Sequence, residues 1–164
     1  MNEIGRMFFL LIILTVSLAG YFLVLNALFA HRLAKSQHIF EQSRARSFWL
    51  GLINLLFFAV LVVALFSMAE RASGAVKTLL NLLALLIAGA MTASLGFGWA
   101  AVANVIAGRF FPQSPSWMKV VMGTVILAFG GALPFAGWFL LLPYTGCAGL
   151  GAFILGFFQK EMKE

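Results

Sequence analysis

Charged residues are missing from four long stretches of this 164-residue chain, and that spacing constrains the fold more than any other feature. The uncharged runs cover 7–30, 48–69, 78–108 and 120–159. A helix crosses a hydrocarbon layer about 30 Å thick with roughly 20 apolar residues, a length that every run reaches. Only 10% of the residues are charged, whereas soluble domains have about a quarter. The sequence therefore predicts an all-α, polytopic transmembrane helical bundle.

We expect one transmembrane domain over residues 1–164. Its predicted spans are 7–30, 48–69, 79–108, 116–131 and 138–158, with a basic linker at 31–47 between the first two. The first run has 24 residues, more than the roughly 7–15 apolar residues of a signal peptide. We therefore expect it to stay as a span, although "ALFA" before residue 31 leaves cleavage open as the alternative.

The run at 120–159 is too long for a single straight span. A helix from 120 to 158 would measure about 58 Å at 1.5 Å per residue. Pro134 lacks the N–H that a helix interior needs, and Gly137 follows it closely, so we expect a turn at 132–137. Pro143 is predicted to kink the last span. Five spans are favoured, with four spans plus a broken or re-entrant element as the alternative.

The basic residues predict an orientation. With five spans and the 31–47 linker inside, eight lysines and arginines are cytoplasmic and three are outside. With four spans the C-terminal pair moves outside and the split becomes six against five. Because cytoplasmic loops are enriched in lysine and arginine, the first topology is favoured. We expect a bacterial inner-membrane protein with its N-terminus outside and its C-terminus in the cytoplasm.

Small residues recur every three or four positions in two predicted spans. In lipid, such a face allows close helix packing. It predicts a partner or self-association interface, or alternatively packing inside the chain's own bundle. The residues are Gly89, Ala93, Gly96, Ala100, Ala103 and Ala107 in the third span, and Gly149, Ala152 and Gly156 in the last.

The linker at 31–47 is strongly basic, with Arg32, Lys35, Arg44 and Arg46 against one acidic residue. Its apolar residues recur loosely at helical spacing, which suggests an interfacial helix. We predict contacts with anionic lipid headgroups or with an acidic partner. The net charge of +6 comes from such short segments between spans, so no nucleic-acid partner is expected.

No residue pattern indicates catalysis. The span centres contain no ionisable residue, which disfavours an ion-coupled transporter. Asn26, Asn54 and Asn104 are instead expected to form hydrogen bonds between helices. We find no nucleophile–base pair, phosphate loop or metal motif, so we predict no enzyme, no cofactor and no metal site.

Several short stretches carry a resemblance to a known group. "SFWLGL" opens a span, "GRFF" closes the long segment, "SPSW" leads the next helix, and "LPFAGWFLLLPYTGCAGLGAFIL" follows. From about 46 to 158 the chain thereby resembles small bacterial membrane proteins associated with the polymer-forming bactofilins. The resemblance implies a non-catalytic membrane partner or anchor and supplies no active-site residues.

Three functions are compatible with these features. The first is a non-enzymatic membrane scaffold or accessory subunit that packs against other membrane proteins. The second is a small channel or a lipid or solute transporter built around the break at 134–143. The third is a pigment- or quinone-contacting subunit of an energy-transducing complex, for which 18 Phe and 4 Trp would supply contacts.

Overall fold

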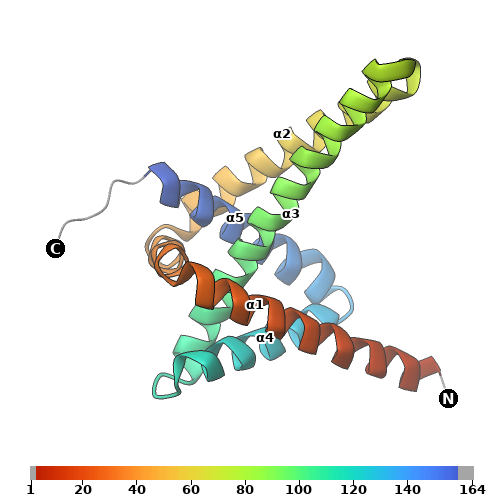
Figure 1. The fold of residues 1–164 in the computed structure, drawn as a ribbon. Coiled ribbons are helices and arrows are strands. Elements are labelled where there is room, and N and C mark those ends of the chain that lie inside the picture. Colours follow the sequence, from red (N-terminus) through yellow and green to blue (C-terminus); the bar gives the residue numbers. More distant parts are fainter. Residues whose placement is uncertain (1–2, 159–164) are drawn as a thin grey trace.

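The computed structural model describes residues 3–158, and in this range the chain is helical with short connections. Figure 1 shows long helices that cross near their middles and spread apart at their ends. This confirms the all-α prediction. The elements are α1 (Glu3–Gln42), α2 (Arg44–Arg71), α3 (Gly74–Phe110), α4 (Ser116–Ala132), the π-helix η1 (Ala136–Leu141) and α5 (Leu142–Phe158).

Helix α1 consists of two limbs that meet at a kink. Phe29 leaves the helical region with φ −128° and ψ 34°. The second limb runs on to Gln42 and buries Leu33, Ile39 and Phe40, while its charged face stays largely outward. Most of the predicted linker at 31–47 is therefore an amphipathic helix, because its apolar residues find a core to pack against. The chain breaks only at Ser43 before α2 begins.

Helices α2 and α3 form a long antiparallel hairpin. It turns at Ala72 and Ser73, and Gly74 opens α3 with φ +60°, a backbone conformation that glycine adopts without a Cβ clash. Helix α3 is one continuous helix of 37 residues, and its first half leaves the bundle together with α2 (Figure 1).

The predicted break at 132–137 is confirmed, but its form is unusual. Helix α4 ends at Ala132, and Pro134 and Phe135 make a tight turn before η1. The π-helix then passes directly into α5, with Pro143 as the second residue of α5. A proline costs least in the first helical turn, and the wider π turn before it accommodates the change of path.

The core lies where the helices cross. One cluster joins α1, α3 and α4 through Phe22, Leu25, Leu33, Ala100, Ala103, Val120 and Leu127. A second joins the far limb of α1 to α3 and α5 through Ile39, Phe40, Val102, Val105, Ala148, Ala152 and Leu155. Because both clusters draw on α3, this helix is the axis around which the others pack.

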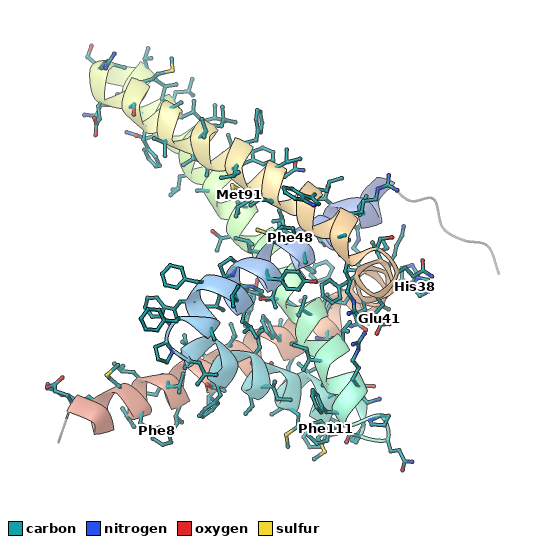
Figure 2. All side chains as sticks on the ribbon, turned by 180° about the vertical axis from the view of Figure 1, so that it is seen from behind. Phe8, His38, Glu41, Phe48, Met91 and Phe111 are labelled. Carbon is teal, nitrogen blue, oxygen red and sulfur yellow. The ribbon has the colours of Figure 1, made fainter. Side chains whose placement is uncertain are left out.

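The connections gather at two ends of the molecule. At one end, which we call the common end, lie the second limb of α1, the start of α2, the α3–α4 loop and the end of α5. Figure 2 shows His38, Glu41 and Phe111 at this end and Phe8 at the other. The helices therefore alternate in direction, as expected for a chain that passes back and forth across a membrane.

Within residues 3–158, four helical stretches are long and apolar enough to cross a membrane: Gly5–Gln42, Arg44–Arg71, Gly74–Phe110 and Ala136–Gly156. Helix α4 is also apolar but has only 17 residues. The fold is that of a multi-pass membrane protein, in agreement with the large apolar side chains exposed along α1, α2 and α3.

Candidate functional site

The fold buries one part of the predicted small-residue face of α3 and leaves the other part exposed. Ala100, Ala103 and Ala107 are fully buried inside the bundle, and a Cβ on Gly96 would collide with the Tyr21 ring of α1. Gly89 and Ala93 are exposed, and space around Gly89 is open. Substituting leucine at Gly96 and Ala100 would consequently disturb the chain's own packing, so these two residues cannot serve to test a partner contact.

The small residues of α5 face inward as well. Gly149 lies so close to Gly98 of α3 that a Cβ on Gly149 would come within 2.5 Å of the Gly98 carbonyl carbon. Ala152 is fully buried, and Gly156 faces Ile39 and Ser36 of α1. These residues hold α5 against α3 and α1.

The tightest helix contact was missed in the sequence. A Cβ on Gly51 of α2 would overlap the Cys147 carbonyl of α5, and one on Gly151 would overlap the Ser47 carbonyl. Ser47–Gly51 and Cys147–Gly151 each have the small-xxx-small spacing that lets helices approach backbone to backbone. That spacing was the signal that could have revealed the α2–α5 contact.

A third close contact joins α4 to α3. The Cβ position of Gly123 falls on the carbonyl of Ala103, so these two helices also touch through their backbones. Gly123 was not among the predicted interface residues. Together with the α2–α5 and α3–α5 contacts, it shows that glycine packing is used mainly to assemble this chain.

Polar side chains in the apolar segments form local hydrogen bonds in most cases. Asn104 Nδ2 donates to Asn26 Oδ1 at 2.7 Å, which confirms a bond between α1 and α3. Asn54 donates to the Leu50 carbonyl of its own helix, so its predicted bond between helices is wrong. The hydroxyls of four buried or half-buried residues likewise donate to the carbonyl four residues earlier: Thr15, Ser36, Thr124 and Thr145.

The basic residues of the predicted linker lie at the common end. Arg32 and Lys35 lie on the second limb of α1, and Arg44 and Arg46 open α2; all but the half-buried Lys35 are exposed. The structure adds two cations to this group. Arg109 pairs with Glu41 at 3.8 Å, and Lys119 Nζ donates to the Pro112 carbonyl at 2.8 Å.

Two exposed tryptophans flank this basic end. Trp49 lies on the second turn of α2 and Trp117 on the first turn of α4, and each is 62% exposed. Tryptophan is enriched at the level of lipid headgroups, and clustered lysines and arginines attract anionic lipid. The common end thus has the side chains of a membrane–water interface.

The break between α4 and α5 depends on Gly137. A Cβ there would collide with the carbonyls of Gly130 and Gly131, so η1 can fold back on α4 only with glycine at this position. Pro134 and Pro143 bracket the turn and η1. Phe135, between Pro134 and η1, has φ +63° and ψ −62°, a conformation rare for residues with a side chain.

An apolar cavity of about 330 Å³ opens where the α2–α3 hairpin diverges from α5. Phe58, Met91 and Phe153 line it, together with Asn54 and Ser94. The Asn54 amide and the Ser94 hydroxyl both donate to carbonyls of their own helices. The cavity therefore offers mainly hydrocarbon contact to anything it holds.

Among residues 3–158, no three His, Cys, Asp or Glu side chains lie close enough to share a metal ion. His31 and His38 are both exposed on the second limb of α1, and the His38 ring contacts Gln42 at 3.3 Å. Comparison of the chain with protein-family models, curated proteins and solved structures finds no match.

Proposed function

We propose that the protein is a non-enzymatic scaffold or accessory subunit that packs against partner membrane proteins in a larger complex. The observation that carries the proposal is that one half of α3 is buried in the bundle and the other half is exposed. Its second half is enclosed by α1, α4 and α5, whereas its first half leaves the bundle with Gly89 and Ala93 exposed. Exposed small residues on a membrane helix allow another helix to approach closely.

The polar groups support a structural role. The apolar helices hold few polar side chains, and most of these donate to the preceding turn of their own helix. Asn26 and Asn104 use their amides to join two helices. A catalytic site needs polar groups that converge on a substrate, whereas these groups are used by the bundle itself.

Gly89→Leu combined with Ala93→Leu tests the proposal. Nothing lies within 4 Å of a Cβ at Gly89, so the bundle tolerates the change, and leucine is a better helix former than glycine. We expect the double variant to insert and fold but to lose its co-purifying partner in mild detergent. Ala59→Leu, at an exposed position of α2 in the same hairpin, is the matched control.

Mass spectrometry of the proteins that co-purify with the natural chain would identify the partner. Unchanged co-purification of the Gly89/Ala93 variant would contradict the proposed interface. The resemblance to bactofilin-associated membrane proteins stays a prediction, and it names one partner class to look for in that experiment.

The proposed location is the bacterial cytoplasmic membrane, with the common end in the cytoplasm. Six cations collect at this end: Arg32, Lys35, Arg44, Arg46, Arg109 and Lys119. Cytoplasmic loops carry the excess of lysine and arginine, and anionic headgroups attract them. The N-terminal limb of α1 and the hairpin turn at 72–73 are then outside, and α5 returns the chain to the cytoplasm. Lys160 and Lys163, which entered the charge comparison, lie outside the described residues.

A second candidate function follows from the cavity between α2, α3 and α5. Its size and apolar lining suit a lipid chain or another apolar molecule, as a small lipid transporter or a quinone- or pigment-contacting subunit would require. Purified protein in liposomes would then move labelled lipid or retain an extractable apolar ligand. A sealed bilayer without lipid exchange, and protein without such a ligand, would contradict this candidate.

A further inference from the structure

The turn between α4 and α5 exposes an unusually apolar surface. Phe135, Trp138, Phe139 and Leu140 are 79%, 68%, 74% and 70% exposed, and Leu133 before them is 57% exposed. The Phe135 and Phe139 rings stack on each other with centroids 6.5 Å apart. No charged residue occurs between Lys119 and Gln159. A turn at a water-facing surface would be expected to carry polar residues instead.

Three N–H groups of this turn donate to carbonyls within the turn itself. Ala136 N–H donates to the Pro134 carbonyl at 2.8 Å across Phe135, which makes a three-residue γ-turn of the rare positive-φ form. Gly137 N–H donates to Leu133, and Phe139 N–H donates to Phe135, both at 3.0 Å. Pro134 has no N–H to satisfy. These bonds lower the cost of placing the turn in hydrocarbon, where unpaired backbone groups are expensive.

The turn also stops short of the other helices. Helix α4 starts at the common end and has 17 residues, about 25 Å at 1.5 Å per residue. The first limb of α1 ends at the common end, and its uncharged part, 7–30, has 24 residues, about 36 Å. Thr15 is the first buried residue in the described part of α1. From Thr15 back toward the N-terminus, as far as Met7, the apolar residues of α1 are mostly exposed.

The α2–α3 hairpin extends past the turn in the same way. Helix α2 has 28 residues, about 42 Å, and its outer half exposes apolar side chains as far as Met68. Figure 1 shows the α4–α5 connection in the opening between the diverging ends of α1 and of the hairpin. Apolar helix surface therefore continues on both sides of the turn and beyond it.

We infer that α4, η1 and α5 form a re-entrant hairpin whose aromatic turn is embedded in the hydrocarbon of the leaflet opposite the common end. The occupant of the opening is lipid acyl chains, which contact Phe135, Trp138, Phe139 and Leu140. The strained residue at the tip is a phenylalanine because a large apolar side chain there faces lipid, while the γ-turn closes the backbone. The inference stands independently of any partner protein.

Cysteine labelling tests the depth of the turn. In a Cys147→Ala background, Phe135→Cys and Leu140→Cys report on the turn, and Ser73→Cys reports on the exposed hairpin tip. With a membrane-impermeant maleimide on both faces of the liposomes, we expect Ser73→Cys to react. Phe135→Cys and Leu140→Cys should remain unlabelled until detergent is added. Labelling of the two turn cysteines in intact liposomes, at the rate of Ser73→Cys, would overturn the inference.

Fluorescence quenching distinguishes lipid from protein as the occupant. We expect bromines placed deep in the acyl chains to quench the Trp138 emission, measured as the difference between the natural chain and Trp138→Phe. The difference between the natural chain and Trp49→Phe should respond less to those bromines, because Trp49 lies at the common end. Turn cysteines protected from maleimide together with an unquenched Trp138 would mean that protein covers the turn, which also overturns the inference.

Discussion

Gly51 shows how a missing side chain decides the distance between two helices. Its Cβ position coincides with the Cys147 carbonyl, and Gly151 has the same relation to Ser47. Lipid is as apolar as the helices, so their association depends on close van der Waals contact. Other glycines have no such constraint: the space around Gly5, Gly20 and Gly89 is open.

We therefore expect Gly51→Ala to destabilise the protein by about 1–3 kcal/mol, the usual cost of overpacking a well-packed contact. The added methyl group meets backbone atoms, which cannot rotate away. Unfolding in mixed detergent, followed by circular dichroism, measures the change.

Gly20→Ala is the matched control, since a Cβ there meets nothing within 4 Å. Alanine should leave stability unchanged or raise it by up to about 1 kcal/mol, through its higher helix propensity. Equal effects at the two glycines would show that backbone contact between α2 and α5 does not hold these helices together.

Among the elements, α1 and α3 are joined by one polar bond in an otherwise apolar contact. Asn104 Nδ2 reaches Asn26 Oδ1, while Asn26 itself donates to the Phe22 carbonyl. The bond fixes the relative position of two helices whose remaining contacts are largely hydrocarbon. The same two helices also meet through the Phe29 and Phe97 rings, which lie edge to face with centroids 5.1 Å apart.

A double-mutant cycle with Asn26→Ala and Asn104→Ala should give a coupling free energy of about 0.5–2 kcal/mol. Each single change leaves a polar group of the other residue without its partner in the bundle. Thermal unfolding in detergent supplies the four stabilities. The cycle of Asn26→Ala with Asn54→Ala is the control and should show no coupling, because Asn54 bonds only within α2.

Across the whole molecule, the cationic common end and the diverging far ends make the two faces chemically different. Six cations and two exposed tryptophans gather at the common end. Among the described residues, the only lysines and arginines at the far ends are Arg6, Arg71 and Lys77. This asymmetry of charge is what orients membrane helices during insertion.

In intact bacterial cells, single cysteines on the two faces should react differently with an impermeant maleimide. We expect Ser73→Cys at the hairpin tip to be labelled from outside and Gln113→Cys in the α3–α4 loop to be protected until the cells are opened. Labelling of Gln113→Cys but not of Ser73→Cys would invert the proposed orientation.

The sequence by itself determined the all-α class and the positions of the apolar helical segments. An uncharged run of about 20 residues can satisfy its backbone inside a bilayer as a helix, so charge spacing located the first limb of α1, α2, α3 and the apolar run that contains α4 and α5. Pro134 and Gly137 predicted the break before the last helix for an equally local reason, the loss of an N–H and of a side chain.

The tertiary structure alone decided which small residues face inward. Gly96 and Gly89 belong to one stripe and look equivalent along the chain, yet only Gly96 meets another helix. It also decided that the predicted linker continues α1 as a helix, since Leu33 and Phe40 become buried against other elements. Spacing shows which residues share a helix face, but which face is covered depends on how distant segments pack together.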